Sequence, residues 1–279
     1  MPGAAPLQTD RPAPVGVDPT RASIARVYDA FLGGKDNYAI DRETLARVAK
    51  VAPEAKDLAT ENRNFLIRAC RFLASQTGIT QFLDCGSGLP TAENTHQVVQ
   101  RFNPDIRVVY VDNDPVVLAH GRALLEENEN THFVAADIFE PREILENETV
   151  RKYIDFSEPV ALLQMGTLHH FRGAPERPAE IMHEYIEALA SGSYVGISHF
   201  SDPEDELSAL ARKMEDVFLH SPMGSGTFRT HAELEKLFDG LELVRPGLTL
   251  CADWWPDGPR IKELNDAQRC ISGAVGRKP

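Results

Sequence analysis

The sequence predicts an α/β protein with a doubly wound, mostly parallel sheet and a helical cover at its N-terminus. Two observations carry this prediction. From residue 79 onwards, short apolar or β-branched runs alternate with helical segments, the pattern of parallel strands joined by crossover helices on both faces. Before residue 79, apolar residues recur at three-and-four spacing, which is typical of helices. A length of 279 residues suits one large domain or two small ones.

The first 78 residues divide into a tail and the cover. Residues 1–18 hold four prolines and few large apolar residues, so we expect a flexible tail. The cover, residues 19–78, contains three helical patterns. The first ends at Gly33-Gly34, because glycine readily adopts the left-handed conformation past a helix end, and the second stops before Pro53. The third spans residues 62–76.

Residues 79–279 form the predicted sheet domain. Its fourth strand is apolar on both faces, as a central parallel strand should be. Thr230 and Glu233 form a capping box that begins the last helix. The expected strands span residues 81–85, 107–111, 132–136, 159–165 and 194–198, with two closing strands at 241–244 and 249–254. The expected helices span residues 91–102 and 179–190, begin at Pro115 and at Asp202-Pro203, and end near Phe238.

Composition excludes several classes of function. The chain has 29 Lys plus Arg against 42 Asp plus Glu, and a net charge of −13 opposes the neutralisation of many phosphates, so we expect no nucleic-acid partner. No apolar run approaches the about 20 residues of a membrane helix and no signal-peptide pattern is present, so we expect a cytoplasmic protein without a membrane partner. The four cysteines form no C-x-x-C pair, so neither a metal site nor a disulfide is predicted.

The segment most informative about chemistry is the glycine loop Asp84-Cys85-Gly86-Ser87-Gly88, which lies between an expected strand and an expected helix. Its glycines let the backbone approach a ligand closely, and the next helix adds partial positive charge. The dinucleotide fingerprint requires a third glycine where this chain has Thr91. The alternative interpretation is a tight turn that binds nothing.

Acidic residues end the next two strands. Asp112 would accept hydrogen bonds from both hydroxyls of a ribose, and Asp137 would lie near an adenine amine, at the strand ends where open α/β sheets bind ligands. Asp114 is expected only to cap the helix that begins at Pro115. Two glycines and no Walker lysine favour a nucleoside cofactor without phosphates. Acidic residues suit the cationic amino and sulfonium groups of S-adenosylmethionine.

These motifs resemble those of the class I S-adenosylmethionine-dependent methyltransferases. A narrower resemblance is carried by Arg26-Val27-Tyr28-Asp29 and by Leu32-Gly33-Gly34-Lys35-Asp36-Asn37-Tyr38. These segments are similar to an actinobacterial group, formerly a domain of unknown function and now called the S-adenosyl methyltransferase family. The resemblance covers about residues 20–257. It implies a Rossmann-like fold with S-adenosylmethionine as cofactor and S-adenosylhomocysteine as product, and it implies no particular methyl acceptor.

The resemblance to the wider superfamily also implies a role for individual residues. The implied cofactor-binding residues are Asp84, Gly86, Ser87 and Gly88 for the methionine end, Asp112 for the ribose, Asn113, Asp137 and Ile138 for the adenine, and Gln164 and Met165 for the methionine portion and the methyl group.

Fewer sequence features indicate which residues contact the methyl acceptor. Lys35-Asp36-Asn37-Tyr38 places four different polar side chains after a double glycine, more than a turn requires, so we interpret this segment as a lid over the cofactor. The alternative is a solvated turn. Tyr28 and Asn62 would join the lid, although Tyr28 would equally suit the core.

Histidines and aromatic residues supply further candidates for the acceptor side. His169 follows the fourth strand and could act as a general base, although a lone histidine is more often structural; His199 is a weaker rival. Because methyl transfer from a sulfonium is an in-line displacement, positioning can suffice without a base. Residues 220–228 form a loop, either a gate or a connection. Five aromatic residues could wall an acceptor pocket, although core positions are commoner for them: Phe200, Phe218, Phe228, Trp254 and Trp255.

Three hypotheses about function follow. The favoured one is S-adenosylmethionine-dependent methyl transfer to a small molecule that enters under the cover. The second is a non-catalytic protein that binds S-adenosylmethionine or S-adenosylhomocysteine. The third is an NAD(P)-dependent oxidoreductase, against which the missing third glycine argues.

Overall fold

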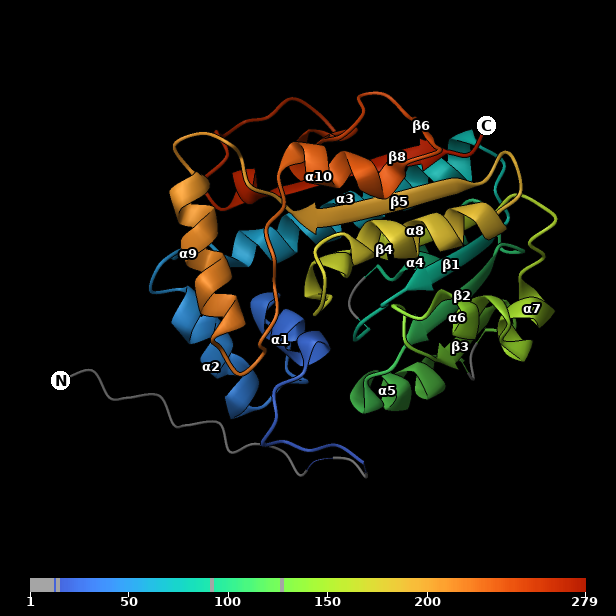
Figure 1. The fold of residues 1–279 in the computed structure, drawn as a ribbon. Helices are drawn as coiled ribbons and strands as arrows, with labels where there is room; N and C mark the ends of the chain where they lie inside the picture. The colour runs from blue at the N-terminus through green and yellow to red at the C-terminus, as the bar shows by residue number, and fades with distance from the viewer. Residues whose placement is uncertain (1–12, 14–15, 91–92, 126–127) are drawn as a thin grey trace.

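A single mixed sheet organises the computed structural model, which describes residue 13 and residues 16–90, 93–125 and 128–279 (Figure 1). Most of the predicted tail, residues 1–18, lies outside these residues. The sheet has eight strands in the described part of the chain. They are β1 (Gln81–Cys85), β2 (Arg107–Asp112), β3 (Thr131–Ala135), β4 (Ala161–Met165), β5 (Tyr194–Phe200), β6 (Glu242–Leu243), β7 (Thr249–Leu250) and β8 (Ile271–Arg277).

The first five strands are parallel and lie in the order β3-β2-β1-β4-β5. The order reverses direction between β1 and β4, so β1 lies centrally and its carboxyl end opens at the switch point of the sheet. Strand β8 runs antiparallel to β5, and β6 and β7 both pair with β8. The predicted mostly parallel, doubly wound sheet is therefore confirmed.

Helices cover both faces of the sheet (Figure 1). One apolar cluster joins the sheet to α3 and α4, and a second joins it to α6, α7, α8 and α10. The helices are α1 (Ile24–Phe31), α2 (Ala39–Val48), α3 (Lys56–Gln76), α4 (Thr95–Val99), α5 (Pro115–Leu125), α6 (Pro141–Leu145), α7 (Glu148–Tyr153), α8 (Arg177–Ala188), α9 (Ser208–Leu219) and α10 (His231–Glu235). The 3₁₀ turns among the described residues are η1 (Leu168–His170), η2 (Lys236–Phe238), η3 (Cys251–Asp253) and η4 (Gln268–Cys270).

The predicted cover corresponds to three helices with different roles. Helix α3 packs directly on the sheet through side chains such as Phe65 and Leu73, which are fully buried. Helices α1 and α2 lie beyond it, beside α9, at the end of the sheet where the arrows of the parallel strands point (Figure 1). Helix α1 begins at an N-cap from Ser23, whose hydroxyl accepts from Arg26 N–H. The outer pair α1–α2 therefore stands over the carboxyl ends of the strands.

Several predicted boundaries were wrong for local reasons. Helix α3 begins at Lys56, before the predicted start at residue 62. The helix predicted at 91–102 is shorter, because Asn94 caps its N-terminus in a capping box with Gln97; residues 91–92 lie outside the described residues. Asp202 does not begin α9. Its carboxylate accepts from the hydroxyl of Ser208, 2.5 Å away, and the helix starts there.

The C-terminal third differs most from the prediction. The strand predicted at 249–254 ends at Leu250, and the chain turns into η3, where the carbonyl of Cys251 accepts from the buried Arg68 guanidinium at 2.6 Å. Strand β8 was not predicted, nor were the short helices α6 and α7. Strand β8 carries two glycines, Gly273 and Gly276, which weaken a strand pattern. An added Cβ on Gly273 would lie 2.9 Å from Phe65, so the close approach of α3 requires glycine there.

Candidate functional site

The glycine loop lies where β1 leaves the sheet. The N–H groups of Gly86 and Ser87 donate to the carbonyl of Val111 at 2.7 and 3.2 Å, which ties the loop to β2. Gly86 has φ +78°, and a Cβ there would lie 2.5 Å from the methyl group of Thr167. Gly88 has φ +65°, and the space beside its Cα is open. Only glycine fits the first position, and the second leaves room for a ligand.

Asp112 holds the other side of this loop. One carboxylate oxygen accepts from Gly88 N–H and the other from Asp114 N–H, both at 2.9 Å. Burial raises the pKa of Asp112 to about 6. Each carboxylate oxygen can accept more than one hydrogen bond, so the group can still receive ribose hydroxyls. Asp114 accepts from Val116 N–H at 2.7 Å, which confirms the predicted cap of α5, and it also accepts from the Ser23 hydroxyl, a contact that was not predicted.

Asp84 is a second buried carboxylate at the same edge. The hydroxyl of Thr95, the first residue of α4, donates to it at 2.6 Å. Burial raises the pKa of Asp84 to about 6, partly offset by this hydrogen bond. Burial makes the ionised form of this carboxylate unfavourable. A cationic ligand beside it would stabilise the ionised form.

The ends of β3 and β4 complete the edge. Asp137 accepts from Phe139 N–H at 2.9 Å, Ile138 lies against Gly86, and Asn113 is exposed beyond β2. At β4, Gln164 is fully buried, and its carbonyl oxygen accepts from the Thr167 hydroxyl at 2.6 Å. Met165 is buried and lies 3.8 Å from the Ser198 hydroxyl.

Two buried polar atoms at this edge have no hydrogen-bond partner in the described part of the chain. They are Oγ of Ser87 and Nε2 of Gln164. Unpaired buried polar groups are rare and point to a missing partner. The edge thus offers two carboxylates for a cationic group, two unpaired polar atoms for a carboxylate, and open space beside Gly88. These groups fit the charges of S-adenosylmethionine. Asp84, Asp112, the loop and the β4 end would hold it.

The outer cover closes over the glycine loop through α1. The Ser23 hydroxyl donates to the carboxylate of Asp114, and Ala25 packs with Leu89, Val116 and Val117. The cover is held internally by the buried pair between Arg26 and Asp41, whose Nε and Oδ2 atoms are 2.8 Å apart. These contacts join α1 both to α2 and to the start of α5.

The segment predicted as a lid forms the turn between α1 and α2. Asn37 donates from Nδ2 to Asp29 at 2.7 Å and to the Gly34 carbonyl at 3.1 Å. Tyr38 is buried and lies 5.2 Å from the Arg26 guanidinium, whereas Lys35 is exposed. The double glycine also has a packing reason, because a Cβ on Gly34 would clash with the carboxylate of Asp29.

A mostly apolar cavity lies between the cover and the ends of β4 and β5. Tyr28, Asn62 and His169, all predicted for the acceptor side, line it together. Its volume is about 40 Å³, room for a few water molecules. Phe200 and Phe218, two of the predicted aromatic residues, also line it. The remaining lining residues were not among the predicted site residues: Ile24, Val27, Phe31, Leu58, Ala59, Gly166, His170, Met223 and Ile271.

Asn62 connects the cover to the sheet at the floor of this cavity. Its Nδ2 donates to the hydroxyl of Tyr28 at 3.0 Å, and that hydroxyl donates to the carbonyl of Ala59 at 3.1 Å. The amide oxygen accepts from Ser198 of β5. Only glycine fits at position 166, where a Cβ would lie 2.8 Å from Asn62 Nδ2.

Three histidines cluster beside the cavity. His199 is fixed from both sides, because its Nδ1 donates to the carbonyl of Phe200 at 2.7 Å and its Nε2 accepts from Arg229 at 2.7 Å. Burial lowers the pKa of His199 and of His170 to about 3, and it also lowers the pKa of His169 well below its usual value. All three rings are therefore neutral at physiological pH.

The other predicted aromatic residues separate into cavity and core. Phe228 stacks behind Phe200, with centroids 4.9 Å apart. Trp254 is fully buried between Phe65 and Phe72, and Trp255 is half-exposed. In the loop at residues 220–228, Met223 reaches the cavity.

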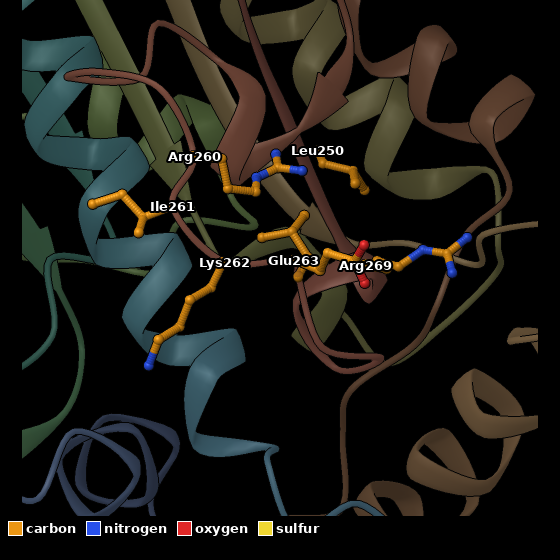
Figure 2. Close-up of a pocket in the computed structure, with 7 residues that line it drawn as sticks. Leu250, Arg260, Ile261, Lys262, Glu263 and Arg269 are labelled. Carbon is orange, nitrogen blue, oxygen red and sulfur yellow. The ribbon is translucent and has the colours of Figure 1, made fainter.

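A separate surface pocket of about 380 Å³ lies on the C-terminal loop (Figure 2). Arg260 and Arg269 line it, and each is already paired with a carboxylate, Asp253 and Asp205 respectively. It shares no residue with the glycine loop or the cavity. Among the described residues, no group of three or more His, Cys, Asp or Glu could hold a metal ion, and no helix is long and apolar enough to cross a membrane.

Comparisons with known proteins agree with this geometry. A family model described as S-adenosyl methyltransferase matches residues 10–279. The crystal structure of a candidate methyltransferase from Thermobifida fusca YX is 44% identical, with a TM-score of 0.89 over 95% of this chain and 98% of that one. A DUF574 family protein from Streptomyces avermitilis is 36% identical, with a TM-score of 0.86 over 93% and 98%. No curated protein sequence matches the chain.

The family match spans nearly the whole chain, and the strand-end residues fit the cofactor that the family name gives. The chain therefore belongs to the S-adenosyl methyltransferase family and is an S-adenosylmethionine-dependent methyltransferase.

Proposed function

We propose that this enzyme transfers the methyl group to a small molecule that enters beneath the α1–α2 cover. The observation that carries the proposal is the cavity lined by Tyr28, Asn62 and His169, which lies next to Gly166 at the end of β4. A net charge of −13 argues against a nucleic-acid acceptor.

The chain's own residues would bind and orient the cofactor and the methyl acceptor, and they would exclude water. When bound, S-adenosylmethionine supplies the methyl group on a sulfonium. Asp112 and the glycine loop would fix the nucleoside, and Asp84 would balance positive charge. The apolar cavity would strip water from the acceptor and hold it in line, which can supply much of the rate enhancement of a displacement.

The closed cavity is smaller than a substrate, so the cover has to move. The buried pair of Arg26 and Asp41 holds α1 to α2. Polar contacts of Ser23 and Tyr28 hold α1 to Asp114 and to α3. Opening of α1 would admit the acceptor, and closure would exclude water during the transfer.

The test uses S-adenosylmethionine labelled with ¹⁴C in the methyl group, the full-length protein, and a cell extract of Streptomyces avermitilis. We expect enzyme-dependent label in the filtrate that passes a membrane retaining macromolecules. Asp112→Ala protein is the matched control for label transferred by other means. Label confined to retained protein or RNA, or tight cofactor binding with no transfer, would overturn the proposal.

A further inference from the structure

The cavity carries no formal charge. Within the described part of the chain, its fourteen lining residues include no Asp, Glu, Lys or Arg. Two arginines behind it are hydrogen-bonded elsewhere, since Arg172 donates to the Met223 carbonyl at 2.5 Å and Arg229 to His199. Arg63, whose charge acts on Tyr28, donates to the Glu93 carbonyl at 2.9 Å. An ionised acceptor would lose its hydration there without gaining a partner of opposite charge. The cavity therefore favours an uncharged acceptor.

Aromatic rings line one side of the cavity. The Phe200 ring lies parallel to His169, with centroids 3.7 Å apart and an interplanar angle of 10°. The rings of Phe218 and Phe228 stack on it at 15° and 22°. The rings therefore present an apolar surface to the cavity. The acceptor that fits this surface has an apolar body.

Most polar groups around the cavity already make hydrogen bonds within the protein. The hydroxyl of Tyr28 donates to Ala59, and both ends of the Asn62 amide are hydrogen-bonded. His169 Nδ1 accepts a long hydrogen bond, 3.4 Å, from Phe200 N–H. The proton of the neutral ring then resides on Nε2, which makes no hydrogen bond within the described residues. The Nε2–H group of His169 can thus donate a hydrogen bond to the methyl acceptor.

His170 is the other histidine of the lining. Its Nδ1 lies 2.9 Å from the Ser225 hydroxyl, and burial together with Arg172 lowers its pKa to about 3. A general base works best with a pKa near the working pH. No lining residue is therefore suited to remove a proton from a hydroxyl group.

We infer that the acceptor is an uncharged molecule with an apolar body and that an amine nitrogen on it receives the methyl group. This inference rests on the proposed function. The nitrogen lone pair forms the new N–C bond while the C–S bond breaks, and the electron pair of that bond stays on sulfur. The total charge is unchanged by the step, so no base is needed. The resulting ammonium group releases its proton to water after leaving.

The experiment partitions the labelled small-molecule product of the previous assay between water and an organic solvent. We expect the label to enter the solvent at alkaline pH and to return to water at acid pH, as an apolar amine does. Label in a neutral ether, or in an ester that alkali cleaves, would overturn the inference that an amine receives the methyl group. Methyl transfer to a small molecule would still stand. Absence of any labelled small molecule would overturn the proposed function and this inference together.

A variant pair at His169 supplies a second readout. His169→Gln keeps an N–H donor, so we expect KM for the labelled acceptor to rise with a smaller change in kcat. His169→Phe removes the donor and keeps the stack on Phe200, and we expect a larger rise in KM. A loss of kcat of about a hundredfold or more in His169→Gln, the usual contribution of a general base, would overturn the inference. Cofactor affinity and Tm verify that both variants fold.

Discussion

The cofactor edge and the acceptor cavity, the two halves of the site, differ in their charge. The cofactor edge holds two carboxylates, the buried Asp84 and the half-buried Asp112, and two unpaired polar atoms. The acceptor cavity is lined by neutral groups only, among the residues that the structure describes. Buried carboxylates are costly without a cation, so the edge is prepared for a charged ligand. A neutral cavity penalises a charged ligand. The difference indicates that the protein binds its charged reactant by electrostatics and selects the other by shape.

The largest expected effect is the loss of cofactor binding in Asp112→Ala. Removing a charge-assisted acceptor for two hydroxyls should weaken binding by about 2–4 kcal/mol, or about 30- to 900-fold in Kd. Thermal stability should change little, because burial of the carboxylate opposes the two backbone hydrogen bonds that it accepts. Titration calorimetry and thermal melting measure the two quantities. Asp105→Ala, an exposed carboxylate before β2, is the control. Comparable affinity in Asp112→Ala would refute the ribose assignment.

This contrast also explains how much the sequence could predict. The cofactor edge is built from residues at the ends of consecutive strands, so Asp84, Gly86 and Asp112 could be identified from one local pattern each. The structure brings these three together at one edge.

The cavity could be predicted only in part, because it is assembled from six separate segments of the chain. Tyr28 and Asn62 are 34 positions apart, and Ile271 lies on a strand that the sequence did not reveal. Residues such as Phe31 and Met223 look like ordinary core side chains, since apolar spacing is the same for a core and for a pocket wall. The double glycine indicated a turn correctly, but the carboxylate that excludes a Cβ at Gly34 is visible only in three dimensions.

Two glycines of the cofactor loop should respond differently to alanine. Gly86→Ala forces a Cβ onto Thr167 at a positive φ, so we expect a loss of about 2–5 kcal/mol in the free energy of unfolding. Gly88→Ala meets open space and should lose only about 1–2 kcal/mol from its positive φ. Urea denaturation measures both. Equal destabilisation by the two substitutions would contradict the packing of the loop against Thr167.

The pH dependence of cofactor affinity should report on the carboxylates of the cofactor edge, since the lining of the cavity holds no carboxylate among the described residues. Burial raises the folded-state pKa of Asp84 and Asp112 to about 6, so the folded chain holds these protons more tightly than the unfolded chain. Their contribution to stability without ligand therefore falls as pH rises from about 4 to 6. A cationic ligand favours the ionised carboxylates, so affinity should rise severalfold between about pH 5 and 7, with proton release.

Calorimetry in two buffers with different ionisation enthalpies measures that proton release. Asp112→Asn cannot titrate and should show a smaller rise in affinity with pH than the parent protein. An affinity independent of pH in this range would mean that neither carboxylate faces the cationic groups of the ligand.

The smallest effects are expected in the turn between α1 and α2, where two neighbours make a matched pair. Asn37→Ala removes hydrogen bonds to Asp29 and Gly34 and should lower the free energy of unfolding by about 1–2 kcal/mol. Lys35 is exposed and makes no interaction among the described residues, so Lys35→Ala should leave stability within about 0.5 kcal/mol. Any role of Lys35 must therefore appear in function alone. If this turn is a lid, Lys35→Ala raises the cofactor KM severalfold with Tm unmoved, because an exposed ammonium group can act only on a bound ligand. Unaltered turnover and affinity in both variants would reduce the segment to a helix-connecting turn.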